Sequence, residues 1–125
     1  MEVKMAQVRY IVHDVEESVS FYTSQLGFEL EQQYGPAMAI LGKDDLKLWL
    51  AGPPASASQP MPDGSEPQPG GWCRIVLTVP ELASVVERLR DANVRFRNEI
   101  IEGPGGNQIL CEDPSGNAIE LFEPS

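Results

Sequence analysis

The stretch Glu112-Asp113-Pro114-Ser115-Gly116-Asn117-Ala118-Ile119-Glu120-Leu121-Phe122 predicts a tight turn followed by a strand near the end of the chain. Asp113-Pro114 is typical of the start of a turn, and Gly116 supplies the left-handed residue that such a turn needs. Side chains alternate along the predicted strand, residues 118–122, so Glu120 faces away from the apolar residues on either side of it. A carboxylate in such a strand needs a partner, which the turn and strand alone leave open as a metal, an arginine, a ligand or water.

The composition predicts one soluble domain and excludes two classes of partner. The chain has 125 residues and a formal charge of −10, with nine basic residues against 19 acidic ones. Nucleic acids and anionic membrane surfaces bind clustered cations, so neither is expected as a partner. No apolar run approaches the roughly 20 residues of a membrane span. The first residues lack the apolar stretch of a signal peptide, so a cytoplasmic location is expected, with Cys73 and Cys111 as free, buried thiols.

Two halves of the chain predict the same order of elements. The first half reads strand, helix and three strands, with Asp14 as helix N-cap and Gly27 as helix stop. The second half repeats this order at an offset of 67 residues, with Pro80 in the first helical turn and Asn93 as stop. The predicted strands cover residues 7–12, 28–34, 37–41, 46–50, 74–79, 94–98, 108–112 and 118–122, and the first helix covers residues 15–26. The sequence therefore predicts an α+β fold made of two βαβββ modules, at about residues 5–50 and 72–124.

A segment rich in Pro, Gly and Ser, residues 51–71, separates the two modules. It cannot form a helix or an interior strand. Two interpretations remain open, a linker that crosses between the modules and a lid over a ligand site. The shorter segment 103–106, Gly-Pro-Gly-Gly, predicts a tight connection between strands and not a phosphate loop, because a strand follows it instead of a helix.

The duplicated order, Phe21-Tyr22 before Leu26-Gly27-Phe28, and the stretch 113–121 together resemble the vicinal oxygen chelate superfamily. That superfamily includes glyoxalase I, extradiol dioxygenases, and fosfomycin- and bleomycin-resistance proteins. The resemblance implies that each module contributes half of a curled sheet whose concave side holds a ligand. It also implies pairing of modules, often across a homodimer, but it does not select one activity.

The same resemblance implies where a metal would be held, and this chain departs from that pattern. The corresponding positions are Gln7, either Lys47 or Trp49, Arg74 and Glu120. A guanidinium has no lone pair to donate and stays protonated, so Arg74 stands where metal-binding relatives usually have histidine but cannot serve as a ligand. We expect Arg74 to form an ion pair with Glu120. That pair either only neutralises two half-buried charges or also lets Arg74 bind an anionic or carbonyl-bearing ligand.

Our main hypothesis is a metal-independent protein that binds a small organic molecule and forms a homodimer, with no cofactor. The alternative is a metal-dependent glyoxalase-like lyase, isomerase or dioxygenase, with Gln7 and Glu120 as a weak metal site. A metal-free enzyme with Glu120 as base is a third possibility, so whether the chain is an enzyme stays open. Trp72 could line the pocket or cover a core edge or dimer seam, and His13 is expected to be a surface residue. The predicted ligand-binding residues are Gln7, Arg9, Trp49, Arg74, Val76 and Glu120.

Overall fold

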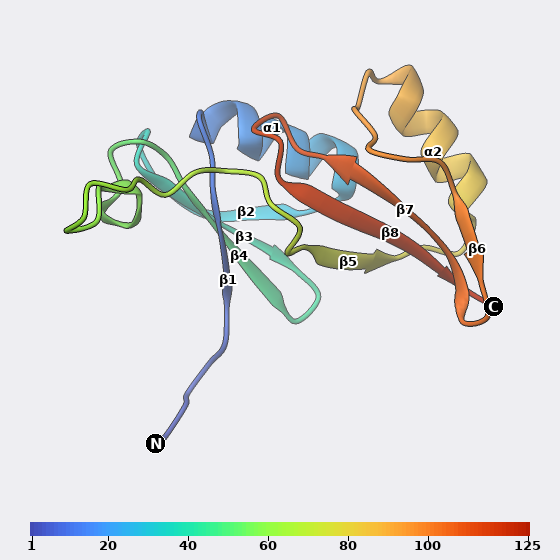
Figure 1. The fold of residues 1–125 in the computed structure, drawn as a ribbon, viewed down its shortest axis with the longest axis horizontal. Coiled ribbons are helices and arrows are strands. Elements are labelled where there is room, and N and C mark those ends of the chain that lie inside the picture. Colours follow the sequence, from blue (N-terminus) through green and yellow to red (C-terminus); the bar gives the residue numbers. More distant parts are fainter. The chain divides into compact units, whose positions relative to one another are not determined.

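The computed structural model describes residues 1–125, which form two compact units, Met1–Pro69 and Gly70–Ser125. Each unit contains one four-stranded sheet and one α-helix in the order strand, helix and three strands (Figure 1). This confirms the predicted α+β fold with two βαβββ modules. The elements of the first unit are β1 (Val8–Ile11), α1 (Val15–Leu26), β2 (Glu29–Tyr34), β3 (Met38–Lys43) and β4 (Leu46–Ala51). Those of the second are β5 (Ile75–Thr78), α2 (Leu82–Asp91), β6 (Ile101–Gly103), β7 (Gly106–Glu112) and β8 (Ala118–Pro124).

In the first unit the strand order is β1-β4-β3-β2, with β1 parallel to β4 and the other pairs antiparallel. The register places Val8, Leu48 and Leu41 in one row of side chains, and all alternate residues along these strands share their face. Leu48 and Leu41 are fully buried, whereas Arg9 in the next row is exposed. One face of the sheet therefore belongs to the core under α1, and the opposite face is open.

Helix α1 begins and ends at the predicted residues because its signals are local. The Asp14 carboxylate accepts a hydrogen bond from the Glu17 N–H at 3.0 Å, which satisfies one of the free donors of the first turn. Gly27 ends the helix with φ of 75°, a left-handed conformation that glycine adopts without strain. The fully buried Tyr22 anchors the helix on the sheet and packs edge-to-face with Phe28.

The second unit repeats this arrangement, with strand order β5-β8-β7-β6. The apolar side chains of Ile119 and Leu121 in β8 are buried and lie on the core face. The N-terminus of α2 lacks a side-chain cap of its own. Glu123 of β8 replaces it, because its carboxylate accepts the Leu82 N–H at 2.8 Å. The prediction that Pro80 lies in the first helical turn is therefore wrong, since the helix begins two residues later.

The predicted strand at residues 94–98 is also wrong. Only one bridge, between Phe96 and Cys111, joins this segment to β7. Pairing stops there because the Asn98 side chain, and not a main-chain carbonyl, accepts the Leu110 N–H at 2.9 Å. On the side of β7 opposite β8, the pairing strand is β6, which reaches β7 through the tight connection predicted at residues 103–106. The remaining strand boundaries agree with the prediction to within two residues.

The Pro/Gly-rich segment divides between the two units. Residues 51–69 fold back on the first unit, where Gly52 bonds to Ala37 and the short 3₁₀-helix Ser56–Ser58 follows. Ser58 and Gln59 donate side-chain hydrogen bonds to carbonyls of the same segment. Gly70 and the residues after it belong to the second unit. Neither α-helix has the length and apolar character that a membrane-crossing helix needs.

Candidate functional site

The open face of the second unit carries the predicted residues Arg74, Val76 and Glu120. Glu120 lies on the central strand β8, with Val76 of β5 and Leu110 of β7 directly beside it in the register. Arg74 immediately precedes β5 and, by alternation, shares the face of Val76. Glu120 is 8% exposed, although Val76 next to it is 52% exposed. The carboxylate is therefore shielded on an otherwise accessible face.

The Arg74 guanidinium provides the partner that the Glu120 carboxylate requires. Its Nε and Nη2 donate to the same oxygen, Oε1, at 3.0 and 2.8 Å. Its Nη1 donates to the Trp72 carbonyl at 3.3 Å. A guanidinium has five N–H donors, so these three hydrogen bonds leave two unused. Because the Arg74 side chain is 29% exposed, those donors can be reached from solvent, and the second Glu120 oxygen accepts no hydrogen bond from the protein.

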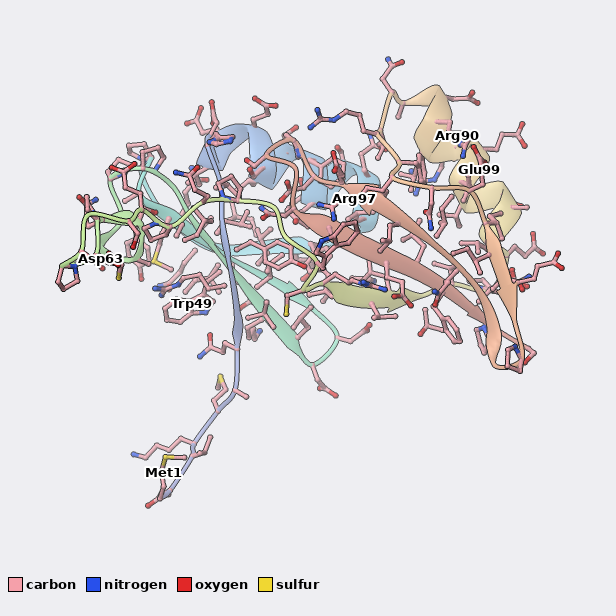
Figure 2. The ribbon with its side chains drawn as sticks, in the orientation of Figure 1. Met1, Trp49, Asp63, Arg90, Arg97 and Glu99 are labelled. Carbon is pink, nitrogen blue, oxygen red and sulfur yellow. The ribbon has the colours of Figure 1, made fainter.

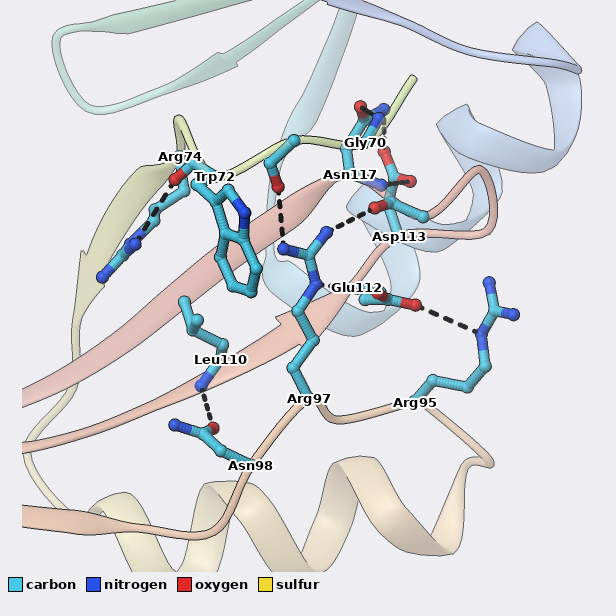
Figure 3. A network of polar contacts seen from close by, with 12 residues as sticks. Gly70, Trp72, Arg74, Arg95, Arg97, Asn98, Leu110, Glu112, Asp113 and Asn117 are labelled. Atoms are coloured by element: carbon cyan, nitrogen blue, oxygen red, sulfur yellow. Dashed lines mark hydrogen bonds and ion pairs between the residues drawn. The ribbon is translucent and has the colours of Figure 1, made fainter. Parts of the chain in front are cut away.

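A second arginine–glutamate pair lies on the same face. Glu112 of β7 stands opposite Ala118, so it faces the same side as Glu120. The Arg97 Nε donates to Glu112 at 2.8 Å, while Nη1 and Nη2 donate to the carbonyls of Gly71 and Gly116 at 2.7 and 2.9 Å (Figure 3). Arg97 thereby joins the segment before β5 to the turn between β7 and β8.

That turn is itself a buried polar cluster. Asp113 is 1% exposed and accepts the backbone N–H groups of Ser115 and Asn117 at 2.9 and 3.0 Å. The Asn117 side chain donates to Asp113 and accepts the Gly70 N–H at 2.8 Å. Gly116 has φ of 89°, the left-handed position predicted for it. The turn thus fixes the residues that lead into Arg74.

Trp72 stands on this fixed segment with its indole mostly in solvent. It is 70% exposed, and the Arg97 guanidinium carbon lies 4.8 Å from its ring centroid. Figure 3 shows the indole next to Arg97. This distance is typical of a cation–π contact, which covers one face of the ring and leaves the other open. Trp72 is therefore not part of the core of this unit.

The open face of the first unit carries the other predicted residues. Arg9 and Trp49 are register partners on β1 and β4, and the Arg9 guanidinium carbon lies 4.9 Å from the Trp49 ring centroid. Trp49 Nε1 is buried and has no hydrogen-bond partner in the protein, a costly arrangement for an N–H donor. Lys47, two residues earlier on the same face, forms an ion pair with Glu31. Gln7 is exposed and precedes β1.

These side chains do not suit a divalent metal ion. Glu120 has a guanidinium bonded to it where a metal would need the carboxylate, and Lys47 brings a second cation to the other corresponding position. No group of three or more His, Cys, Asp or Glu side chains in the chain could hold a metal ion. His13, the only histidine, is exposed between β1 and α1, as predicted.

The cysteines differ from the prediction in one respect. Cys111 is buried on the core face of β7, and this burial raises the pKa of its thiol to about 12. Cys73 is exposed, so its predicted burial is wrong. It lies before the first residue of β5, and the alternation that buries Ile75 does not extend to it. Burial therefore keeps the Cys111 thiol from acting as a nucleophile.

Each unit has a hollow whose walls do not include Glu120. A hollow of about 540 Å³ lies beside α2, with Val86, Arg90 and Ile100 among its walls. Arg90 and Glu99, which form an ion pair at 2.9 Å, both line it, and Figure 2 shows these two side chains together. A hollow of about 400 Å³ lies in the first unit between the end of β1 and the Pro-rich segment, with His13 and Glu66 among its walls.

Sequence reasoning missed Arg97 and did not assign Glu112 or the buried Asp113 and Asn117 a role around the site. One signal was present, since the basic residues Arg95 and Arg97 alternate in a segment that precedes a run ending in Glu112. That pattern indicates a charge pair across neighbouring segments. The carbonyl partners of Arg97 leave no trace in the sequence.

The fold and this face define a member of a known family. Residues 4–121 match the Glyoxalase/Bleomycin resistance protein/Dioxygenase superfamily, and the chain belongs to it. Its resemblance to the vicinal oxygen chelate proteins is thereby confirmed.

Three relatives illustrate the range of that family. A lactoylglutathione lyase of Pseudomonas putida is 24% identical over 140 aligned positions, which cover 91% of this chain and 81% of that protein. The structure of TnmS3, an antibiotic binding protein from Streptomyces sp. CB03234, superposes with a TM-score of 0.73 at 26% identity and covers 100% of this chain and 99% of that one. A superfamily member from Sphaerobacter thermophilus DSM 20745 has a TM-score of 0.75 at 25% identity, with 98% and 99% of the two chains covered.

Proposed function

We propose that this protein binds a small organic ligand with an anionic or carbonyl oxygen, without a metal, through Arg74 and Glu120. The observation that supports this most directly is the geometry of the pair. Arg74 has two N–H donors unused, and Glu120 has one oxygen without a protein partner. A ligand that carries both an acceptor oxygen and a hydrogen-bond donor would satisfy both groups at once.

The role of the remaining predicted residues follows from their chemistry. Val76 supplies apolar surface beside Glu120, and Arg9 and Trp49 supply a cation stacked on an aromatic ring. The unpaired Trp49 N–H is a further donor that a ligand could satisfy. Gln7 could contribute an amide. The structural relative TnmS3 is an antibiotic binding protein, which supports a binding function for this fold.

A calorimetric and thermal-shift screen tests the proposal, because a ligand that binds only the folded state raises its melting temperature. The screen would use organic acids, amides and alcohols of matched size against the full chain. We expect acids and amides to bind and Arg74→Met to abolish that binding. Arg90→Met is the matched control, because Arg90 also pairs with a glutamate but lies on α2. Equal binding by the two variants contradicts the proposal.

The rival function is a metal-dependent glyoxalase-like lyase, isomerase or dioxygenase, and the lactoylglutathione lyase relative favours it. Elemental analysis of the purified protein separates the two. Stoichiometric Ni, Zn, Mn or Fe that is lost in Glu120→Ala, but retained in the exposed control Glu102→Ala, would establish the rival. Absence of metal in all three proteins agrees with our proposal.

We further propose that the protein forms a homodimer in the cytoplasm. Large apolar side chains on the sheets are exposed in the single chain, among them Leu30, Tyr34 and Ile101. Pairing of such faces would remove this surface from water. Light scattering coupled to size exclusion measures the mass directly, and a monomer at micromolar concentration refutes the dimer.

A further inference from the structure

We propose that Trp72 is a ligand-stacking residue positioned by Arg97, and that the site takes planar aromatic acids. This inference rests on the proposed function, because it specifies the class of ligand that Arg74 binds. Trp72 lies two residues before Arg74 and shares a hydrogen bond with it, so the aromatic surface and the anion-binding donors adjoin.

The first step is that Trp72 is exposed but held in place. Three consecutive residues are each anchored: the Gly70 N–H by Asn117, the Gly71 carbonyl by Arg97 and the Trp72 carbonyl by Arg74. An exposed tryptophan on a mobile segment would lose much conformational freedom on binding a ligand. One on an anchored segment has already lost most of it, which favours binding.

The second step is that only one face of the indole is available. Arg97 is 17% exposed and makes three hydrogen bonds, one to the segment before β5 and two to the β7–β8 turn and its edge, so it is a rigid backing for the ring. A guanidinium stacked on one face draws electron density from the indole and leaves the opposite face free for an offset-stacked ring. The apolar Val76 and the half-buried Leu110 lie on the same side of the sheet as Arg74, on either side of its partner Glu120.

The third step is that the Trp72 indole and the Arg74 guanidinium can bind the same ligand. A flat apolar surface next to two unused guanidinium N–H groups fits an aromatic ring that bears a carboxylate. An aliphatic acid would satisfy Arg74 but could not stack on Trp72. A neutral aromatic molecule would stack but would leave Arg74 without an anion. Selectivity for both features together is therefore the signature of this site.

Calorimetry with three probes on the full chain tests the inference: 2-naphthoate, cyclohexanecarboxylate and 2-naphthalenemethanol. We expect 2-naphthoate to bind at least tenfold more tightly than either of the others. Trp72→Leu should weaken 2-naphthoate about threefold to tenfold, the range of an aromatic pair, and leave cyclohexanecarboxylate unchanged. Trp72→Phe, which retains a ring, should restore most of the loss. Trp72 is exposed, so neither substitution disturbs the core.

Arg97→Lys tests the positioning role, because lysine keeps the charge but lacks the planar fork. We expect it to weaken 2-naphthoate as Trp72→Leu does, with cyclohexanecarboxylate again unchanged. In a Trp49→Phe background, where Trp72 is the only tryptophan, Arg97→Lys should also increase acrylamide quenching of its fluorescence. A merely structural role for Arg97 would weaken both acids equally, and that outcome overturns the positioning role.

Other outcomes separate this inference from the proposed function. If both acids bind equally and Trp72→Leu affects neither, aromatic stacking is refuted while anion binding by Arg74 stands. If neither acid binds, both are overturned. If Trp72→Leu changes only the oligomeric mass, Trp72 belongs to a dimer seam and the inference is wrong.

Discussion

Replacing Arg74 with methionine should destabilise the protein far more than the same change at Arg90. Both arginines form one short ion pair with a glutamate, at 2.8 Å for Arg74–Glu120 and 2.9 Å for Arg90–Glu99. The environments differ, because the Glu120 side chain is 11% exposed and that of Glu99 is 84% exposed. Removal of the cation leaves Glu120 as a shielded, unpaired charge, whereas water solvates Glu99 at once.

The magnitude follows from that difference in burial. Breaking a buried pair by removing one partner costs about 3–5 kcal/mol, and the partial exposure of Arg74 reduces this to about 2–3 kcal/mol. An exposed pair contributes about 0–1 kcal/mol, so Arg90→Met should cost less than about 1 kcal/mol. Glu120→Gln should cost about 1 kcal/mol, because the amide oxygen still accepts from Arg74. The double variant should cost less than the sum of the single ones, since it removes both charges together.

Urea denaturation followed by circular dichroism gives the free energy of unfolding for each variant, with equal slopes as a check that the unfolding reaction is unchanged. The reasoning fails if Arg74→Met and Arg90→Met cost the same within about 0.5 kcal/mol, the size of a typical surface effect. It also fails if the effects of Arg74→Met and Glu120→Gln are additive. Either result would mean that Glu120 is solvated like a surface carboxylate and that its ion pair with Arg74 does not stabilise the fold.

Four further changes test the rest of the structure. Asp113→Ala should cost about 3 kcal/mol in urea denaturation because three hydrogen bonds to a buried carboxylate are lost, whereas Asp113→Asn, which keeps an acceptor, should cost about half of that. Gly106→Ala should cost on the order of 2 kcal/mol in the same assay, because φ is 148° and a Cβ would lie 2.2 Å from the Glu123 carbonyl oxygen. A thiol reagent should modify Cys73 in the native protein but Cys111 only after unfolding, which mass spectrometry detects. Burial raises the pKa of Cys111 from 9.0 to about 12 in the folded state, so the neutral thiol stabilises the fold fully below pH 9.0 and this contribution is lost as pH rises to about 12. Cys111→Ala should therefore lose less free energy of unfolding than the parent protein over that pH range.

Local signals explain why much of the fold could be predicted. The bounds of α1 depend on Asp14 and Gly27, which act on their own neighbours and are visible in the sequence. The prediction of a strand at residues 94–98 was wrong because a non-local contact decides the structure there. The apolar alternation of this segment is present, but the Asn98 side chain accepts the Leu110 N–H in place of a main-chain carbonyl. Such a hydrogen bond depends on the neighbouring strand and cannot be predicted from the segment alone. Because the second half repeats the first, the order of strand, helix and three strands predicted for the first module also predicted the second.

The part of the site that could be predicted came from the family resemblance. That resemblance placed Arg74 and Glu120 at corresponding positions on one face, and the expected ion pair is present. Arg97 was missed because its three partners come from two segments far apart in the sequence and two of them are main-chain carbonyls. Trp72 was left open because a bend, and not a strand, determines its direction. Such contacts are products of tertiary packing and have no periodic signature.

The overall charge makes the local donors of Arg74 decisive. With a formal charge of −10, the protein as a whole disfavours the approach of an anion. Salt screens that repulsion beyond about 8 Å at physiological ionic strength, so only groups in contact with the ligand can attract it there. On the open face of the second unit Arg74 pairs with Glu120, and Arg97 and the more exposed Arg95 share Glu112 at 2.8 and 3.7 Å. An anion held on this face must therefore be held by direct hydrogen bonds, and the two unused N–H groups of Arg74 supply them.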